Sequence, residues 1–409
     1  MSTAASLRSN FAWTFAGNAV YAAGQWAILS LLAKLGSSEM LGQYAFALAV
    51  TAPVTMLVHL NLRAVIGTDI AHKHLFRDYL SVRLWTTIAG LAAIGVLAWA
   101  VAPTRPMLLV ILLAGLAQSA ENVSDAFYGA WQRHERMDRI AVSMIARAAL
   151  SAAAIGIALW LTHDIVIAVA ALAAARLTTL LAWDARVGTE PVAGQPSTGS
   201  GFAILRTALP LGLVLMLVTL NTNLPRYAIE RFAGIRELGA FAAVAGFLTA
   251  GNTIINALGQ SATPRLARYF HDRDVARFRR LILQLGGISV ALGAAGVSGA
   301  VLLGASILRL LYRDEYAQYA GLLAAVMFAG IPIYVASTLG YVITSVRAFD
   351  AQLPLFGAVA ATCAIASWLL ISRFGLMGAP MALAAAACVQ AIGELAILRR
   401  AFRRVEQAR

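Results

Sequence analysis

Residues 80–102 read LSVRLWTTIAGLAAIGVLAWAVA, and this stretch carries a single charged side chain, Arg83, close to its start. An α-helix rises about 1.5 Å per residue, so the stretch is long enough to cross the roughly 30 Å of hydrocarbon in a bilayer. The rest of the chain is similar: 60% of its 409 residues are hydrophobic, 12% are charged and the mean hydropathy is +0.75. Too few polar residues remain to cover a water-soluble core. The sequence therefore predicts an all-α integral membrane protein.

The same pattern recurs along the chain and predicts twelve transmembrane helices. The longest gap between them, at 184–206, is polar and contains Gly, Pro, Ser and Thr, which is typical of a flexible linker. No soluble catalytic domain fits into the gaps, so we expect a transporter rather than an enzyme, with no catalytic residues. The predicted spans are 11–33, 41–62, 80–102, 107–131, 140–161, 164–183, 207–226, 237–259, 281–303, 318–346, 354–371 and 375–397.

The basic residues fall mainly in alternate gaps. If Arg8 and the N-terminus lie in the cytoplasm, most of the 32 lysines and arginines lie on the cytoplasmic side, as the positive-inside rule requires. An even number of spans then places both termini in the cytoplasm. This bias also accounts for the net charge of +13, so nucleic acid is not an expected partner.

The chain divides into two halves that open alike. The first contains EMLGQYAF at 39–46 and the second contains ELGAF at 237–241. This similarity predicts two parallel repeats related by an axis along the membrane normal, as in several transporter folds. We expect two pseudo-symmetric six-helix bundles, at 1–183 and 207–409, joined by a cytoplasmic linker at 184–206. Together they would surround a central cavity that opens to either side by alternating access.

Ionisable side chains occur at membrane depth in the first half. Glu121 and Asp125 are four residues apart and share a helix face, and Arg147 and Arg176 lie at about the depth of Asp125. Such groups are costly in hydrocarbon and are functional candidates. One interpretation is an internal Asp125–Arg147 salt bridge that locks two helices. The other is a cationic cavity floor, in which Arg147, Arg176 and Asn122 bind an anionic headgroup while Glu121 or Asp125 couples transport to an ion.

The second half carries amides instead. Asn252 and Asn256 share one face of a predicted helix, and Asn221 and Asn223 lie in the preceding span. Helix–helix hydrogen bonds and a sugar-facing surface are equally good interpretations of these four residues. Glu394, near the end of the last span, is expected to pair with Arg399 or to snorkel to the membrane surface.

Metal and cofactor signals are weak. Cys363 and Cys388 both lie in predicted spans and are expected to be small core residues. The six histidines have no metal-ligand spacing, so neither a metal site nor a cofactor is predicted, and H⁺ or Na⁺ is the candidate coupling ion. Residues 63–83 and 264–280 are predicted to form amphipathic cytoplasmic helices on anionic membrane lipid.

Short motifs add a family signal. They are LNLRAV at 60–65, ENVSD at 121–125, QRHERMDR at 132–139, LNTNLPRY at 220–227, ALGQS at 257–261 and PRLA at 264–267. Together they resemble segments of bacterial polysaccharide flippases, the exporters of lipopolysaccharide and exopolysaccharide precursors in the multidrug/oligosaccharidyl-lipid/polysaccharide exporter superfamily. The resemblance covers residues 10–395.

The resemblance implies two six-helix lobes in the bacterial inner membrane. It also implies an undecaprenyl-pyrophosphate-linked oligosaccharide as substrate, with a polysaccharide polymerase and export machinery as candidate partners. A pyrophosphate suits arginine, whose forked donors match its oxygens. An ion-coupled multidrug exporter of the same superfamily is the alternative, but a cavity for organic cations favours carboxylates and aromatic rings over arginine. A membrane polysaccharide polymerase is disfavoured because the external gaps are short.

Overall fold

The computed structural model describes residues 7–68, 74–188, 201–346 and 351–407, and within them the chain is helical nearly throughout. A π-helical turn, η1, covers Leu180–Asp184, and short 3-10 helices cover Asp314–Tyr319 and Gly375–Met377. The α-helices are α1 (Leu7–Leu35), α2 (Ser38–His59), α3 (Leu62–Thr68), α4 (Phe76–Val101), α5 (Arg105–Arg133), α6 (Met137–Thr162), α7 (Ile165–Thr179), α8 (Ala185–Val187), α9 (Gly201–Ala233), α10 (Ile235–His271), α11 (Val275–Leu311), α12 (Ala320–Ser345), α13 (Gln352–Phe374) and α14 (Gly378–Gln407).

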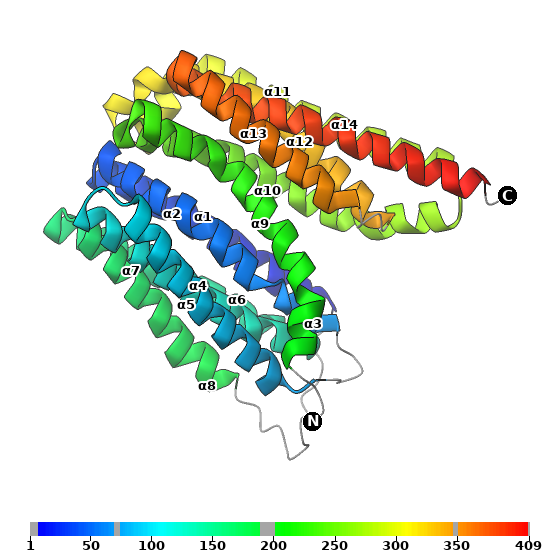
Figure 1. The fold of residues 1–409 in the computed structure, drawn as a ribbon, viewed down its shortest axis with the longest axis horizontal. Coiled ribbons are helices and arrows are strands. Elements are labelled where there is room, and N and C mark those ends of the chain that lie inside the picture. Colours follow the sequence, from blue (N-terminus) through cyan, green and yellow to red (C-terminus); the bar gives the residue numbers. More distant parts are fainter. Residues whose placement is uncertain (1–6, 69–73, 189–200, 347–350, 408–409) are drawn as a thin grey trace. The chain divides into compact units, whose positions relative to one another are not determined.

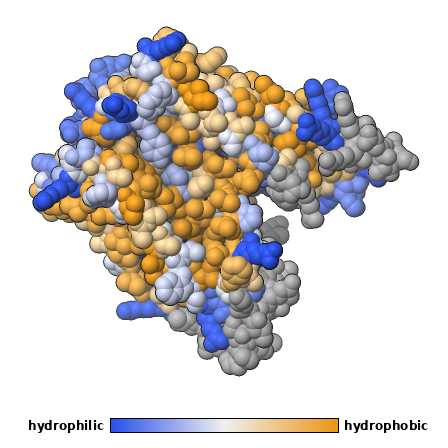
Figure 2. Space-filling model, in the orientation of Figure 1, coloured by the Kyte–Doolittle hydropathy of each residue, from blue (hydrophilic) through white to orange (hydrophobic). Residues whose placement is uncertain are grey.

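Each predicted span coincides with a long helix. Ten apolar segments of the described chain are long enough to cross a membrane, and one of them, Gln352–Phe402, contains α13 and most of α14. Helix α1 is 29 residues long but is not among the ten, because Asn10, Asn18 and Gln25 lower its hydropathy. Apolar side chains cover most of the face seen in Figure 2, while hydrophilic ones gather near helix ends. The protein is thus an all-α, multi-pass integral membrane protein.

Local sequence signals set the helix ends. The side chains of Ser37, Thr104, Asp164 and Asp274 each accept a hydrogen bond from a backbone N–H in the first turn of the helix that follows. Gly375, with φ 57°, follows the last residue of α13 in a conformation that glycine adopts without strain. These signals turn the chain sharply, so successive helices run back along one another (Figure 1).

The helices form two compact units, Met1–Thr219 and Leu220–Arg409, and the boundary between them falls inside α9. The expected linker at 184–206 includes residues 189–200, which lie outside the described residues. Before that segment the chain is in η1 and α8, and after it the chain is in α9.

The two units repeat one pattern of helix pairing. In the first unit α2 packs against α4 and α5, α4 packs against α5, and α7 packs against both α5 and α6. In the second unit the helices at the same places in chain order pair the same way: α10 with α11 and α12, α11 with α12, and α14 with α12 and α13. The motifs at 39–46 and 237–241 both lie at the start of the second long helix of a unit. The predicted pseudo-symmetric pair of six-helix bundles is confirmed.

Small residues allow α1 and α6 to approach each other closely. A Cβ added at Gly17 would lie 2.9 Å from the Cα of Ala141, and one added at Gly24 would lie 2.6 Å from the Cβ of Ala148. Both contacts join α1 to α6, which are the most extensively packed pair of helices. Helices in lipid commonly associate through small residues that let their backbones approach closely. Burial of apolar surface from water does not drive their association there.

One prediction about the cytoplasmic loops is wrong. Residues 264–280 do not form a separate amphipathic helix, because α10 continues past Pro264 to His271 and α11 begins at Val275. The three-residue turn between them leaves no room for another element. At 63–83 a short helix, α3, does follow α2, but residues 69–73 lie outside the described part of the chain.

Candidate functional site

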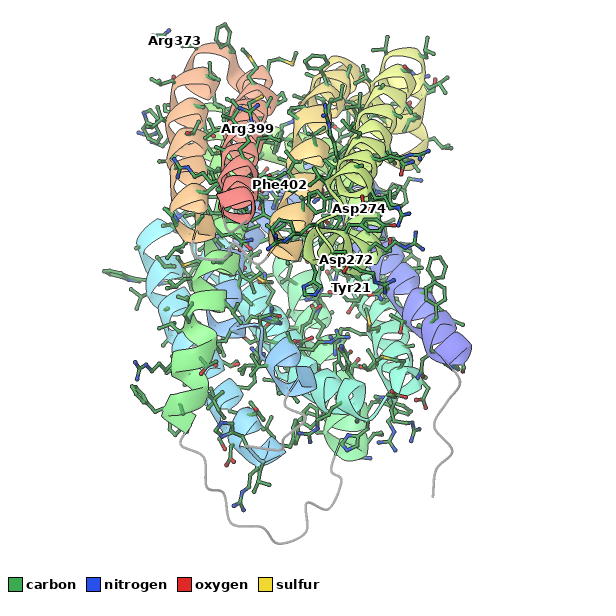
Figure 3. The ribbon with its side chains drawn as sticks, turned by 90° about the vertical axis from the view of Figure 1, so that its right-hand side faces the viewer. Tyr21, Asp272, Asp274, Arg373, Arg399 and Phe402 are labelled. Carbon is green, nitrogen blue, oxygen red and sulfur yellow. The ribbon has the colours of Figure 1, made fainter. Side chains whose placement is uncertain are left out.

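A network of charged and polar side chains lies inside the first unit, at membrane depth. Arg176 on α7 donates from Nη1 to Glu121 Oε2 on α5 at 2.8 Å, and from Nη2 to Gln25 Oε1 on α1 at 3.5 Å. Tyr21, also on α1 and labelled in Figure 3, donates its hydroxyl proton to the other oxygen of Glu121. The side chain of Arg176 is 5% exposed and that of Glu121 is 27% exposed. The carboxylate is therefore the accessible partner of a nearly buried arginine.

A second ion pair in the same unit is more completely buried. Arg147 on α6 donates from Nη2 to Asp184 Oδ2 at 3.1 Å, and the two side chains are 2% and 0% exposed. The guanidinium of Arg147 lies 5.5 Å from the ring centroid of Tyr128, whose hydroxyl is 2.7 Å from that of Ser143. Buried charges are tolerated when they are paired in this way.

These contacts correct the charge pairing predicted from the sequence. Arg147 pairs with Asp184, not with Asp125, and neither Arg147 nor Arg176 is an unpaired cation. The physical reason is the π-helical turn at the end of α7, which contains Asp184. A π turn inserts an extra residue and so rotates the residues after it around the helix. This rotation directs the side chain of Asp184 toward α6, although the sequence pattern places Asp184 in the linker.

Asp125 has different partners. Its carboxylate lies 3.0 Å from His59 Nε2 and 3.5 Å from Arg63 Nη1. These two residues flank the break between α2 and α3, where Leu60 and Asn61 have φ of 53° and 49°. Asp125 thus holds together the two sides of a helix break.

Arg83, from the stretch that identifies the fold, stabilises the same break. Its side chain is fully buried and donates from Nη1 to the carbonyl of Val58 at 3.2 Å. The last carbonyls of a helix have no partner within it, and a cation at that end also interacts favourably with the helix dipole. Arg83 therefore caps α2 from α4.

The predicted amides mostly connect helices. Asn122 is 5% exposed and donates to the carbonyl of Thr55, joining α5 to α2. In the second unit Asn252 accepts from Ser337, joining α10 to α12. Asn221 has a buried Oδ1 with no hydrogen-bond partner, Asn223 is buried, and Asn256 is half-buried.

Three further observations concern Glu394, the two cysteines and possible metal ligands. Glu394 is 2% exposed and accepts from Gln390 at 3.0 Å, so the expected pair with Arg399 is wrong: five residues of helix turn the two side chains about 140° apart. Cys363 is buried, as expected, but Cys388 is exposed. The described residues contain no cluster of three His, Cys, Asp or Glu side chains that could hold a metal ion.

Sequence reasoning missed Tyr21, Gln25, His59 and Asp184. Tyr21 and Gln25 were detectable, because polar residues four apart in an apolar span share one helix face. Asp184 follows Arg176 by eight residues, again close to the same face, and this spacing was the available signal.

Comparison with known proteins adds to this geometry. Residues 7–270 match the family described as polysaccharide biosynthesis protein. The chain belongs to this family. The capsular polysaccharide biosynthesis protein CapF of Staphylococcus aureus is 25% identical to this chain over 397 residues. The match covers 96% of this chain and 99% of CapF.

Solved structures support the fold. An inward-facing multidrug resistance MATE family transporter of the MOP superfamily has a TM-score of 0.76 at 15% identity, covering 95% of this chain and 98% of its own. The lipid II flippase MurJ in an inward closed conformation has a TM-score of 0.72 at 10% identity, covering 95% of this chain and 87% of its own. The family match confirms the predicted relation to polysaccharide biosynthesis proteins, and the two solved structures confirm the fold.

Proposed function

We propose that this protein carries an undecaprenyl-pyrophosphate-linked oligosaccharide from the inner to the outer leaflet of the bacterial inner membrane, by alternating access, with both termini in the cytoplasm. The observation that carries the proposal is the relation to polysaccharide biosynthesis proteins along nearly the whole chain, in a protein built from membrane-length helices. The described residues contain no domain outside the helices in which to place polymerising chemistry. A glycan assembled on a lipid, however, must cross the membrane before it can be used outside.

The Glu121–Arg176 pair is our candidate for the headgroup site. A pyrophosphate carries more negative charge than one carboxylate and presents oxygens that match the guanidinium fork. Glu121 is the partly exposed member of the pair, so an arriving pyrophosphate can displace it from Arg176 while Gln25 still orients the guanidinium. Arg147, which is paired with the fully buried Asp184, is the second candidate contact for the headgroup.

The amides of the second unit are proposed to contact the sugar. Asn221 is the best candidate, because its Oδ1 has no hydrogen-bond partner among the described residues. Asn223, Asn252 and Asn256 complete the proposed surface. Carboxylates Glu121 and Asp125 keep their proposed role in H⁺ or Na⁺ coupling, since displacement by an anion would free either one to bind a cation.

Reconstitution tests the proposal. Purified protein in lipid vesicles is given an undecaprenyl-pyrophosphate oligosaccharide with a fluorescent sugar, and a membrane-impermeant reductant reports the fraction on the outer leaflet. Replacing Arg176 by Gln removes charge-assisted hydrogen bonds of about 1.5–3 kcal/mol, so flipping should slow about 10- to 100-fold at limiting substrate. Arg231→Gln, an exposed arginine on α9, is the control. Equal rates for both variants would remove Arg176 from the site.

One observation favours a second candidate function. The partly exposed Glu121, beside the ring of Tyr21, is the type of group that attracts organic cations. Vesicles loaded with ethidium decide between the two. Export of ethidium without flipping of the glycolipid would replace the flippase by an ion-coupled multidrug exporter.

A further inference from the structure

The second unit contains a buried acid that has no cation beside it. Glu394 lies on α14 and is 2% exposed. Its Oε1 accepts one hydrogen bond, from Gln390 Nε2 at 3.0 Å, and its Oε2 is buried with no hydrogen-bond partner in the described structure. The backbone of Gly340 on α12 lies directly against this carboxyl, since a Cβ added at Gly340 would be 3.3 Å from Oε1.

The repeat makes this isolation informative. By its place in the helix pairing, the α12–α14 interface of the second unit corresponds to the α5–α7 interface of the first. There Glu121 on α5 meets Arg176 on α7. In the second unit the acid is on the last helix and glycine faces it. One interface thus contains a matched ion pair, and its counterpart contains a carboxyl alone.

The neighbouring helices supply no countercharge to Glu394. None of their described ionisable side chains is hydrogen-bonded or ion-paired to it, and Arg373 lies at the end of the unit opposite Phe402 (Figure 3). Leu355 of α13 packs against Gly393, which makes the adjoining surface apolar. Besides Glu394, the ionisable side chains that the structure describes on these three helices are Tyr334 and Tyr341 on α12, Cys363 and Arg373 on α13, and Cys388, Arg399 and Arg400 on α14.

We propose that Glu394 is a proton-binding site of the second unit, occupied when α12 and α14 are packed as they are here. An ionised carboxyl buried without a partner is so costly that such groups take up a proton instead. A proton suits the site better than Na⁺, because a hard cation needs several oxygen ligands and the bonded neighbour here is an N–H donor. The protonated oxygen needs only one acceptor or a water molecule.

Proton release is then linked to helix movement. Ionised Glu394 requires water or a cation, and while α12 and α14 remain in contact its side chain is 2% exposed with Oε2 buried. Separation of these helices would admit water and release the proton, and repacking would require it again. If the protein is the flippase proposed above, this site couples the conformational cycle to a proton gradient, independently of Glu121 and Asp125.

Infrared spectroscopy of the purified protein tests the site directly. The wild-type spectrum at neutral pH should contain a protonated-carboxyl band that is lost in Glu394→Gln. The matched control is Glu121→Gln, which removes a buried acid that has a cation beside it and should delete ionised-carboxylate bands instead. Loss of ionised-carboxylate bands in Glu394→Gln would overturn the proposal. The amide variant keeps the size and neutrality of the protonated acid, so it should fold.

Flipping assays with and without a pH gradient test the coupling. In Glu394→Gln the difference between the two rates should shrink, while the exposed-arginine control Arg231→Gln keeps the wild-type response. A response retained in Glu394→Gln would show that its proton does not drive transport. Failure of the wild type to flip any glycolipid would count against the proposed function alone, because the infrared result does not depend on substrate.

Discussion

The Arg147–Asp184 pair should be one of the strongest single determinants of stability in the first unit. At 3.1 Å and an effective dielectric constant of about 20, two unit charges attract by about 5 kcal/mol. Replacing Arg147 by Met removes this attraction and leaves Asp184 charged in a fully buried position. The carboxylate can escape only by taking up a proton, which costs an ordinary aspartate about 4 kcal/mol at pH 7. We therefore expect Arg147→Met to lower the free energy of unfolding by about 3–5 kcal/mol.

Two comparisons isolate the cause of that loss. The double variant Arg147→Met/Asp184→Leu should recover most of it, because well-packed apolar residues can replace a buried pair. Arg309 and Asp314 form an ion pair at 2.8 Å whose side chains are 65% and 85% exposed, so Arg309→Met should cost under about 1 kcal/mol.

Chemical unfolding of the purified protein in detergent micelles, followed by tryptophan fluorescence, measures these free energies. The deficit of Arg147→Met should shrink by about 1.4 kcal/mol for each pH unit below 7, since solvent then supplies the proton more readily. A deficit below about 1 kcal/mol that does not change with pH would refute the reasoning.

Three further predictions concern transport, packing and topology. Glu121→Gln should slow flipping and weaken its dependence on an ion gradient; an unchanged dependence would transfer coupling to Asp125 or to Glu394. Gly24→Val should destabilise the protein by about 1–3 kcal/mol, because the added side chain collides with Ala148, whereas Gly95→Ala, which adds a Cβ in open space, should be nearly neutral in the same unfolding assay. Reporter fusions after Arg409 and within residues 189–200 should both be cytoplasmic, and an external signal from either would contradict the topology.

The fold was largely predictable because hydropathy acts on whole segments. A span such as residues 80–102 has no alternative to a membrane helix, and every predicted span coincides with one in the structure. Helix ends were less predictable. α10 continues through Pro264 because one missing N–H is a small loss when the rest of a long helix stays bonded.

The sequence predicted several charged residues of the candidate site but not which of them pair with one another. Depth estimates placed Arg147 near Asp125, but depth along the membrane normal does not say which way a side chain points. A single π turn directs Asp184 toward Arg147. The helix break at Leu60 places His59 and Arg63 beside Asp125. Such local irregularities leave little trace in composition, so charge partners are the part of a membrane protein that sequence patterns specify least.

The repeated helix pairing has a consequence for biosynthesis. All five pairings that recur join helices of the same unit, so each helix of the first unit finds these partners before α10 leaves the ribosome. The first six membrane helices can therefore assemble while the second unit is still being translated. Nascent chains stalled after α9 should already resist proteases as a folded body, and an early defect such as a bulky residue at Gly24 would be exposed to quality control before the chain is complete.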